Sequence, residues 1–562
     1  MTPIIECVPN FSEGSNLQVI QQITGEMEAV EGVRLLNTDP GKATNRTVVT
    51  IVGNPAAVVE AAFRAIRKAG ELIDMRLHRG EHPRMGATDV CPLIPVSGIS
   101  MEETAEWARK LGERVGNELA IPVYLYEAAQ KNQSRNNLSV IRAGEYEGFA
   151  EKIKDPFWKP DFGPAVFDQK RGATVIGARD FLVAYNVNLN TTSVRRANNV
   201  AFDVREAGRV KREGDPVNGN IVRDANGQPV MVPGSLKSVK AIGWFIEEYG
   251  IAQISMNLTN IVVTPLHIAF DEVCRKAEAR GIRVTGSELV GLIPLHSLLD
   301  AGKYFLKKQK RSAGVSEQEL IRIAIRTMGL DELAPFKPEE KIIEYLLKDP
   351  ADEKLARLSL SGFADETASE SAAPGGGSVA AYLGALGASL GAMVANLSAH
   401  KKGWEDRWES FSDWAEKATA CKKELLSLVD ADTRAFQGIM QARSLPKNTE
   451  SEKSLRTKTL REANILAIEI PFKLMQLSLK SMDILKAMAT DGNPHSISDA
   501  GVGALSARSA VLGAYLNVCI NAKGSESDPA IATIVADGKI MKEKAIEKEC
   551  EILDLVGLKM NV

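Results

Sequence analysis

Histidine is scarce in this chain, with six among 562 residues, so a histidine inside a polar turn is a candidate acid or base near neutral pH. His82 lies in the segment Arg79–Asp89, which also holds two arginines, two acids and two glycines. This composition fits a proton-transferring imidazole beside anion-binding arginines, and it fits a surface loop with a capping histidine equally well. His78 is the nearest substitute for His82. His267 and His296 lie in helical patterns and are predicted to be structural.

Two further polar stretches fall at the ends of predicted strands. Asp39–Arg46 is a turn that offers carboxylate-binding groups, and loops at strand ends are frequent places for binding sites. A plain hairpin turn has the same composition. Asp161–Pro164 and Gly172–Thr174 frame a glycine-rich stretch that either lets a flat ring approach the backbone or serves as an interdomain loop.

The last third of the chain contains a glycine turn and a pair of acids. Gly375, Gly376 and Gly377 precede a helical pattern, and free N–H groups at a helix start bind carboxylate or phosphate. Close helix packing is the commoner reason for such glycines. Asp430 and Asp432 lie at i and i+2 of a helix, so they point to different faces. An acid that faces a pocket has a raised pKa and can act as a general acid, whereas a solvated acid has no such role.

Several classes of protein are disfavoured. HExxH, CxxC, the EF-hand loop, the P-loop and a strand-borne GxGxxG do not occur, so we expect no metal site and neither of those nucleotide-binding folds. The formal net charge of -3 leaves no basic excess for nucleic acid, although a few arginines suffice for a small anion. Six scattered cysteines and a start without a leader pattern predict a cytoplasmic chain with free thiols. The charge-free run Ser371–Ala399 is built from Gly, Ala and Ser, which favours a buried helix over membrane insertion.

The elements that must position these residues change character along the chain. Residues 1 to about 330 alternate β-branched runs with amphipathic stretches, whereas helical periodicity dominates after about 355. Two successive β-α-β-β-α-β orders predict two α/β sandwiches of the ferredoxin-like split βαβ type, whose sheets can face each other across a cleft. The first copy is expected to end on a strand at Val123–Tyr126. A polar excursion or β-hairpin, Arg209–Leu236, interrupts the second copy.

The predicted domains are 1–178 and 179–332 for the two sandwiches, 333–354 for a charged linker, and 355–562 for an all-helical bundle. Helices of the bundle are expected to include 404–432, 451–470, 497–522 and 529–555. Small residues such as Gly384, Gly387 and Gly503 permit close approach of these helices, within one chain or between chains.

Long motifs resemble a known enzyme family. Residues 6–14, 45–47, 80–87, 141–147, 160–164 and 286–295 are similar to glutamate formimidoyltransferase. Residues 373–381, 429–432 and 445–448 resemble the cyclodeaminase domain that is fused to it in formimidoyltransferase-cyclodeaminases. The resemblance covers nearly the whole chain in family order. The length of Arg209–Leu236 departs from it, and the role of that segment stays open.

The resemblance implies that the first part transfers a formimidoyl group from N-formimidoyl-L-glutamate to N5 of tetrahydrofolate, late in histidine degradation. It places the catalytic histidine at His82, which would take the N5 proton and pass it toward the leaving glutamate nitrogen. Arg46 and Arg84, with Asp39 nearby, are the candidates for binding the substrate. The folate-binding segment of the family falls on residues 163–172, with Gly163, Pro164 and Gly172 as candidates.

For the helical part, the resemblance implies attack of N10 on the formimidoyl carbon and loss of ammonia, which gives 5,10-methenyltetrahydrofolate. An amine leaves poorly unless it is protonated, and the family assigns the acid to Asp432, with Asp430 as the weaker candidate. Gly375, Gly376, Gly377 and Lys447 are binding candidates. The resemblance also implies a polyglutamylated folate and a homo-oligomer, an octamer in family members.

Two other interpretations stay open. The helical part can act mainly as a methenyltetrahydrofolate cyclohydrolase, because related helical domains catalyse that reaction. Alternatively, one domain is a catalytically silent, folate-binding scaffold. Ammonia release in proportion to methenyl formation separates the cyclodeaminase from the cyclohydrolase.

Overall fold

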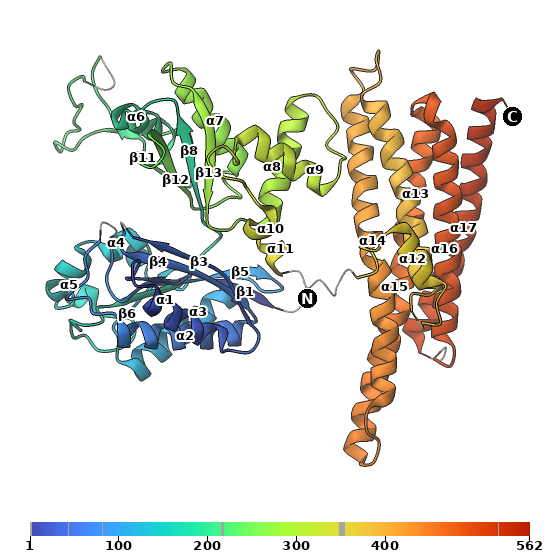
Figure 1. The fold of residues 1–562 in the computed structure, drawn as a ribbon, viewed down its shortest axis with the longest axis horizontal. Coiled ribbons are helices and arrows are strands. Elements are labelled where there is room, and N and C mark those ends of the chain that lie inside the picture. The colour runs from blue at the N-terminus through green and yellow to red at the C-terminus, as the bar shows by residue number, and fades with distance from the viewer. Residues whose placement is uncertain are drawn as a thin grey trace. The chain divides into compact units, whose positions relative to one another are not determined.

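The computed structural model describes residues 3–42, 44–80, 83–214, 218–347, 354–371, 373–525 and 528–561. Its contacts divide the chain into two compact units, which are drawn in Figure 1. The first unit comprises Met1–Ser297 and Met328–Leu346, and the second comprises Leu298–Thr327 and Leu347–Val562. Each unit has a hydrophobic core of its own.

A mixed seven-stranded sheet begins the first unit. β1 (Ile4–Cys7) and β2 (Asn10–Phe11) pair antiparallel with β4 (Arg46–Gly53) on one side and β5 (Thr88–Ser97) on the other. β3 (Val33–Gly41) pairs with β4, and β7 (Thr174–Ala178) lies parallel between β5 and β6 (Val123–Glu127). Helices α1 (Leu17–Glu28), α2 (Pro55–Leu72) and α3 (Met101–Leu119) cover one face of this sheet (Figure 1).

Side chains alternate between the two faces of the first sheet, and this alternation determines which residues lie on the face without helices. Ile5 and Cys7 of β1 are buried in the core beneath the helices, so Glu6 between them points to the opposite face. On β4, Val49 and Ile51 likewise enter the core, whereas Arg46, Val48 and Thr50 do not. The uncovered face therefore carries the polar and charged residues.

The second sheet of the first unit has four antiparallel strands in the order β11-β12-β8-β13. They are β8 (Val183–Leu189), β11 (Val239–Ile246), β12 (Ile251–Leu258) and β13 (Val284–Val290), with α6 (Val194–Val204) and α7 (Leu266–Glu278) between them in the chain. The chain order is the predicted β-α-β-β-α-β. The first sheet has the same arrangement in β3-β4-β1-β5. The predicted fold class, two α/β sandwiches followed by helices, is confirmed.

One strand of the first copy was wrongly predicted. The fourth strand of the βαββαβ unit is β5, whereas Val123–Glu127 forms the additional edge strand β6. β5 contains Pro92 and Pro95, which lack an N–H and argue against a strand in the sequence. Here the carbonyl of Pro92 accepts a hydrogen bond from the Val8 N–H at 3.2 Å, and Pro95 lies beyond the residues that pair with β7.

Shorter elements complete the first unit. α4 (Leu138–Arg142) and α5 (Glu145–Lys152) follow β6, and α10 (Pro338–Lys341) and α11 (Ile343–Leu347) follow the second sheet. β9 (Arg209–Val210) and β10 (Met231–Val232) pair antiparallel, which confirms a β-hairpin within Arg209–Leu236. Single 3-10 turns lie at Gln133–Arg135 and Pro156–Trp158 here, and at Pro494–Ser496 in the second unit.

The second unit starts with most of α8 (Leu295–Lys308) and with α9 (Glu317–Met328). The loop between them is held by the bundle, because the Gly314 carbonyl accepts hydrogen bonds from Asn396 Nδ2 at 2.9 Å and Thr419 Oγ1 at 3.1 Å. The division by contacts thus differs from the predicted boundaries over Leu298–Thr327. Contact units need not coincide with family domains, so the predicted domain boundaries stay a prediction.

The rest of the second unit is helical. Its elements are α12 (Leu360–Thr367), α13 (Gly376–Ala399), α14 (Trp408–Ser444), α15 (Glu450–Asp491), α16 (Ile497–Ala522) and α17 (Pro529–Met560). Gly387 of α13 lies against the backbone of Gly503 and Ala507 in α16, which allows close approach of these helices. Gly376–Ala399 and Pro494–Ala522 are long and apolar enough to cross a membrane by length and composition alone. Most of the apolar window of the first is buried inside the bundle, as expected for a core helix.

α15 is longer than predicted, because the helix continues through Pro471 rather than ending at Ile470. Proline within a helix removes the hydrogen bond to the carbonyl four residues earlier. That carbonyl belongs to Ala467, and it accepts a hydrogen bond from Asn521 Nδ2 of α16 at 2.8 Å. A side chain distant in the sequence therefore replaces the missing backbone donor, which local sequence patterns do not reveal.

We expect the Asn521→Ala substitution to lower the free energy of unfolding of the full chain by about 1 to 3 kcal/mol, because it leaves a buried carbonyl unpaired. In a Pro471→Ala background the restored N–H can take over, so the same substitution should cost less. Urea unfolding of the four chains of this double-mutant cycle measures the difference. Asn517→Ala is the control, since Asn517 Nδ2 donates only to Gly513 O of its own helix. An equal penalty in both backgrounds contradicts this role of Asn521.

Candidate active sites

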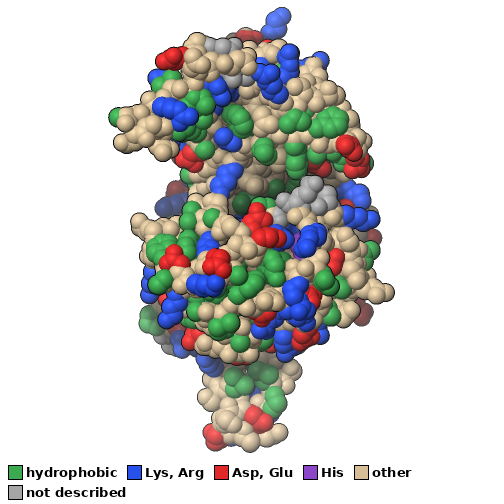
Figure 2. All heavy atoms as spheres, turned by 90° about the vertical axis from the view of Figure 1, so that its left-hand side faces the viewer, with side chains coloured by type: hydrophobic (Ala, Val, Ile, Leu, Met, Phe, Trp, Pro, Cys, Tyr) green, Lys and Arg blue, Asp and Glu red, His purple; other side chains and the backbone are tan. Residues whose placement is uncertain are grey.

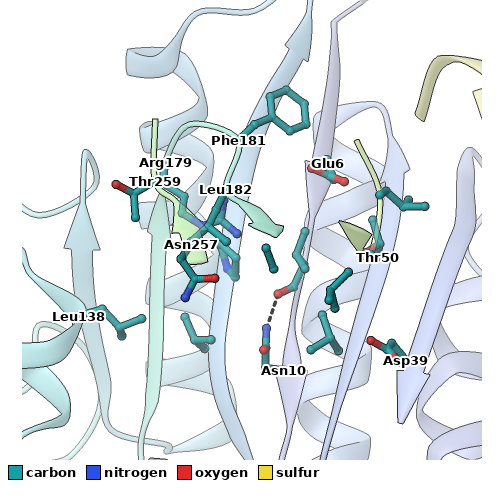
Figure 3. Close-up of a pocket in the computed structure, with 18 of the residues that line it drawn as sticks. Glu6, Asn10, Asp39, Thr50, Leu138, Arg179, Phe181, Leu182, Asn257 and Thr259 are labelled. Carbon is teal, nitrogen blue, oxygen red and sulfur yellow. Dashed lines mark hydrogen bonds between the residues drawn. The ribbon is translucent and has the colours of Figure 1, made fainter. Parts of the chain in front are cut away.

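A cavity of about 430 Å³ lies in the first unit and is lined by residues from the uncovered faces of both sheets. The first sheet contributes residues from β1 to β6, and the second contributes Ala184, Lys240, Asn257 and Val290. Figure 2 shows the molecule hollowed between these two layers, with Lys and Arg side chains around the hollow. In Figure 3, Glu6, Thr50 and Asp39 lie on one side of the cavity, and Arg179, Leu182, Asn257 and Thr259 lie across from them. The predicted cleft between two sheets is thus present.

The cavity is rich in cations. Arg46, Arg142, Arg179 and Lys240 line it, together with the carboxylates Glu6 and Asp39. Arg142 also pairs with the buried carboxylate of Asp89, so Arg46, Arg179 and Lys240 are the cations that face the space most directly. Burial lowers the pKa of Arg46 to about 10, an effect that Asp89 opposes and Arg142 strengthens, so Arg46 remains charged at neutral pH. Such an excess of positive charge in a recess suits a small polycarboxylate. The structure therefore brings two predicted residues, Arg46 and Asp39, to one cavity.

His82 lies outside the described residues, but the loop before it has a defined place. Asn45 Nδ2 donates to the Arg79 carbonyl at 2.8 Å, and His78 Nε2 lies 2.9 Å from the Asn45 carbonyl. A Cβ at Gly80 would lie 2.4 Å from the Thr44 carbonyl, so only glycine allows this approach. The residues that lead to His82 are thus fixed beside the turn from which β4 starts at Arg46.

Arg84 does not line the cavity. Its guanidinium binds Glu147 through two hydrogen bonds, of 2.6 and 2.9 Å, and also lies 3.3 Å from Glu145. Arg84 Nε donates to His78 Nδ1 at 3.3 Å, which makes His78 Nε2 the donor to the Asn45 carbonyl. The buried Arg84 therefore joins its own loop to α5, and His78 is held by both ring nitrogens. A role of Arg84 in binding substrate stays a prediction.

Gly163, Pro164 and Gly172 do not line the cavity either. Gly163 and Gly172 have φ of 82° and 69°, and a Cβ on either would meet a carbonyl, of Ile121 at 2.4 Å or of Met85 at 2.1 Å. Both positions require glycine for backbone conformation and for close packing. Their predicted contact with folate stays untested.

The second cavity, of about 170 Å³, lies at the N-terminal end of α13 in the helical unit. Gly375 lines it as the N-cap of α13, Gly376 and Gly377 line it from the first turn of that helix, and Asp432 lines it from α14. Its other residues include Thr433, Phe436, Ala467, Asn517 and Asn521. The glycine turn and the acid that the sequence proposed separately are therefore brought together. Lys447 is exposed between α14 and α15 and does not line this cavity, so its binding role stays a prediction.

The two acids of α14 have different surroundings. Asp430 is buried and accepts hydrogen bonds from the backbone N–H groups of Leu355 at 2.8 Å and Ala356 at 3.0 Å. Asp432 faces the cavity, and the Ser378 hydroxyl donates to its Oδ2 at 3.3 Å. Because i and i+2 point to different sides of a helix, one acid fixes the chain before α12 and the other is available for chemistry.

Burial raises the pKa of Asp432, and hydrogen bonds from Ser378 lower it only partly. The acid form therefore persists to higher pH than in a solvated aspartate, as a proton donor requires. A Cβ on Gly377 would lie 2.1 Å from Asp432 Oδ1, so the carboxyl group rests directly on the glycine backbone. This contact explains why glycine is needed at the third position of the turn.

Sequence reasoning missed several residues of the two cavities. Glu6 and Asn10 belong to a motif that carried the resemblance, yet nothing in the sequence shows that both face the cleft. Arg142 likewise belongs to a motif that carried the resemblance, whereas Arg179 and Lys240 come from distant parts of the chain and carry no local signal, and the same holds for Asn517 and Asn521. Among the described residues, no group of three or more His, Cys, Asp or Glu side chains is placed to hold a metal ion.

A cation-lined cleft between two α/β sandwiches and a half-buried acid at a cavity of a helical unit are typical of a multidomain enzyme with two reaction sites. Comparison with known proteins identifies the family. Residues 4–179 match the formiminotransferase domain, N-terminal subdomain, residues 184–348 match the formiminotransferase domain, and residues 359–537 match formiminotransferase-cyclodeaminase. The chain belongs to the formimidoyltransferase-cyclodeaminase family, which confirms the resemblance seen in its motifs. It is a bifunctional enzyme with a transferase part and a cyclodeaminase part.

Three relatives illustrate this assignment. The mouse formimidoyltransferase-cyclodeaminase is 45% identical over 529 residues, which cover 94% of both chains. A glutamate formimidoyltransferase of Thermoplasma acidophilum is 42% identical and covers 54% of this chain and 92% of its own. A methenyltetrahydrofolate cyclohydrolase of Methylorubrum extorquens is 37% identical over 166 residues, 30% of this chain and 80% of its own.

The pH dependence of stability tests the surroundings of Asp432. Its raised pKa means that the folded state holds the proton more tightly than the unfolded state. This carboxyl group therefore destabilises the fold increasingly as pH rises from the ordinary value of 3.8 through the raised pKa. Below pH 3.8, where the carboxyl group is protonated in both states, we expect Asp432→Asn and the unsubstituted chain to have similar free energies of unfolding. At pH 7 we expect Asp432→Asn to be the more stable chain. Urea unfolding at several pH values checks this, and an unchanged difference between the two chains contradicts it.

The glycine turn gives a second prediction. Gly377→Ala should displace the Asp432 carboxyl group and reduce cyclodeaminase turnover by at least about tenfold, because a methyl group cannot share its position. Gly438→Ala is the matched control, since Gly438 of α14 does not line the cavity and nothing lies within 4 Å of a Cβ there. Turnover of 5-formimidoyltetrahydrofolate by the two variants is the measurement. Equal activity of both variants would show that the contact with Gly377 does not position the acid.

Proposed function

We propose that the first unit transfers the formimidoyl group of N-formimidoyl-L-glutamate to N5 of tetrahydrofolate, and that the second unit cyclises the product to 5,10-methenyltetrahydrofolate with release of ammonia. The observation that carries this proposal is the presence in one chain of both a cation-lined cavity and a shielded carboxyl group at a helix start. The names of the curated relatives support both activities.

The transferase step needs residues that bind the two carboxylates of the substrate and a residue that transfers one proton. Arg46 and its neighbouring cations are suited to the carboxylates of the glutamate moiety, since guanidinium binds carboxylate in a planar, bidentate manner. N5 attacks the formimidoyl carbon, the tetrahedral intermediate collapses, and the glutamate nitrogen leaves as an amine. His82 is assigned the transfer of the N5 proton to that nitrogen.

The cyclisation step needs an acid. N10 attacks the formimidoyl carbon, and the former imine nitrogen leaves as ammonia once it is protonated. Asp432 is the donor, because its surroundings favour the acid form and it faces the cavity. Asp430 is not the donor in this proposal, because its carboxylate accepts hydrogen bonds from the backbone N–H groups of Leu355 and Ala356.

Three further properties belong to this proposal. The folate carries a polyglutamate tail, for which the basic residues around the first cavity are suited. The chain forms a homo-oligomer, as large as an octamer, and the exposed apolar side chains of α13 and α16, among them Leu397, Leu516 and Ile520, favour self-association. The enzyme acts in the cytoplasm, where its six free cysteines stay reduced.

One relative favours a second candidate for the helical unit. The similarity to a methenyltetrahydrofolate cyclohydrolase over 166 residues supports hydrolysis of the methenyl group as its main activity. A coupled assay with formimidoyl-glutamate and tetrahydrofolate separates the two, because only the cyclodeaminase releases one ammonia for each methenyltetrahydrofolate formed. A silent scaffold would produce neither.

We expect two substitutions to separate the activities of the full chain. Asp432→Asn should reduce ammonia release by about a hundredfold or more while transfer continues, and 5-formimidoyltetrahydrofolate should accumulate. His82→Ala should reduce transfer by a similar factor while supplied 5-formimidoyltetrahydrofolate is still deaminated. Ultraviolet absorbance of the methenyl product and an ammonia assay follow both steps. Loss of both activities in either variant, or full activity, would refute the assigned role.

A further inference from the structure

The amide of Asn517 is a polar group in the cavity of the helical unit that the proposed reaction does not yet use. Asn517 lies on α16 and lines the cavity together with Asp432. Its Nδ2 donates a hydrogen bond to the Gly513 carbonyl at 2.9 Å. Among the described residues, no hydrogen bond to its Oδ1 is found. One N–H of Nδ2 and the acceptor Oδ1 therefore remain for a ligand.

The contact with Gly513 fixes the orientation of this amide. A carbonyl oxygen only accepts, so the group that faces it must be the NH2 end of the side chain. Rotation of the amide by half a turn would place Oδ1 against the Gly513 carbonyl, where two acceptors repel each other. Asn517 thus presents a donor and an acceptor in a fixed order. An amide that rotates freely would accept ligands of either order and could not distinguish them.

The glycine turn shows how the amide lies relative to the acid. A Cβ on Gly376 would lie 3.7 Å from Asn517 Nδ2, and a Cβ on Gly377 would lie 2.1 Å from Asp432 Oδ1. Consecutive residues of one turn therefore contact the amide nitrogen and the carboxyl group. In a cavity of about 170 Å³, a bicyclic ring that binds the amide also comes close to the acid.

The reacting head of the proposed substrate is a 4-oxopterin, whose edge is the complement of a primary amide. Its O4 accepts and its N3–H donates, side by side. Amide side chains bind such paired edges with two hydrogen bonds at once. O4 also flanks N5, the atom that carries the formimidoyl group. When Asn517 Nδ2 donates to O4 and Oδ1 accepts from N3–H, the N5 substituent lies on the side of the turn that contacts Asp432.

Phe436 supplies a flat surface beside this edge. It follows Asp432 by four residues on α14, so both side chains lie on the same side of that helix, and both line the cavity. Phe436 is 40% exposed. Stacking on an aromatic ring holds a bicyclic ring whatever groups its edge carries. The cavity therefore has one residue for the face of the ring and another for its edge.

We propose that Asn517 binds the N3–O4 edge of the pterin, directs the N5 substituent toward Asp432, and makes the cyclodeaminase selective for 4-oxo over 4-amino folates. This inference rests on the proposed function of the second unit. A 4-amino folate has a donor in place of O4 and an acceptor in place of N3–H, so both hydrogen bonds are lost. The described lining residues include no Lys or Arg, so the direction of hydrogen bonds decides the selectivity.

The test measures how two ligands inhibit deamination of supplied 5-formimidoyltetrahydrofolate by the full chain. The ligands are 5-formyltetrahydrofolate and its 4-amino analogue, which differ only at the pterin edge. Because the assay follows release of ammonia, it reports on the site of the second unit and not on that of the first. For the unsubstituted chain, we expect 5-formyltetrahydrofolate to have an inhibition constant about tenfold to a hundredfold lower than that of the analogue.

Two variants separate recognition of the edge from stacking. Asn517→Asp should reverse the preference, because a carboxylate only accepts and the analogue donates from its 4-amino group and from a protonated ring nitrogen. Phe436→Leu should weaken both ligands by about fivefold or more and keep their ratio. Gln437→Glu makes the same amide-to-acid change at an exposed residue that does not line the cavity. This control should leave both inhibition constants within about twofold.

Equal inhibition of the unsubstituted chain by the two ligands would overturn this inference, and so would a preference that Asn517→Asp leaves unchanged. In either case, continued release of ammonia still supports the proposed function. A chain that releases no ammonia from 5-formimidoyltetrahydrofolate would overturn the proposed function and this inference together. The first comparison needs no variant, so it decides the matter even where a substituted chain does not fold.

Discussion

The two-residue period of the strands is the constraint on which the transferase unit depends. Each strand of the first sheet has one side committed to the core beneath α1, α2 and α3, so every second residue must point to the other face. Ile5 and Cys7 pack inward, and Glu6 therefore points into the cleft. A shift of one residue in the pairing of β1 with β4 and β5 would bury Glu6 among aliphatic side chains and expose Ile5 and Cys7. The site is thus fixed by the same hydrophobic pattern that stabilises the sheet.

The sequence was sufficient for the order of elements and for some site residues. Repeated β-α-β-β-α-β patterns predicted both sandwiches, and the i, i+2 spacing of Asp430 and Asp432 predicted that only one of them faces a pocket. Which one does so depends on the backbone of residues 355 and 356, which is distant in sequence. Two elements were wrong for a common reason. Proline argues against both a strand at Pro92 and a continuous helix at Pro471. In the fold, the Pro92 carbonyl still accepts a hydrogen bond from Val8, and Asn521 supplies the donor that Pro471 lacks.

Residue type alone does not distinguish the surroundings of two arginines. Arg46 and Arg84 both lie in polar turns of similar composition, and both were predicted to bind substrate carboxylates. Arg46 starts a strand whose alternation points it into the cleft, whereas Arg84 reaches Glu145 and Glu147 of a helix that follows much later in the chain. The carboxylates that occupy Arg84 come from the protein itself. A guanidinium is therefore assigned to a ligand only after its internal partners are known.

The two cavities use burial of a carboxyl group for different purposes. Burial raises the pKa of both Glu6 and Asp432. The positive charge of Arg179 opposes the effect of burial on Glu6, so the acid and charged forms of this carboxyl group are nearly balanced at pH 7. Asp432 lies in a helical cavity without lining Lys or Arg among its described residues, so its acid form is retained and can supply a proton. The second reaction must expel a nitrogen as ammonia, which requires a proton donor. The protonation state of each acid thus follows from the charges around it as well as from its burial.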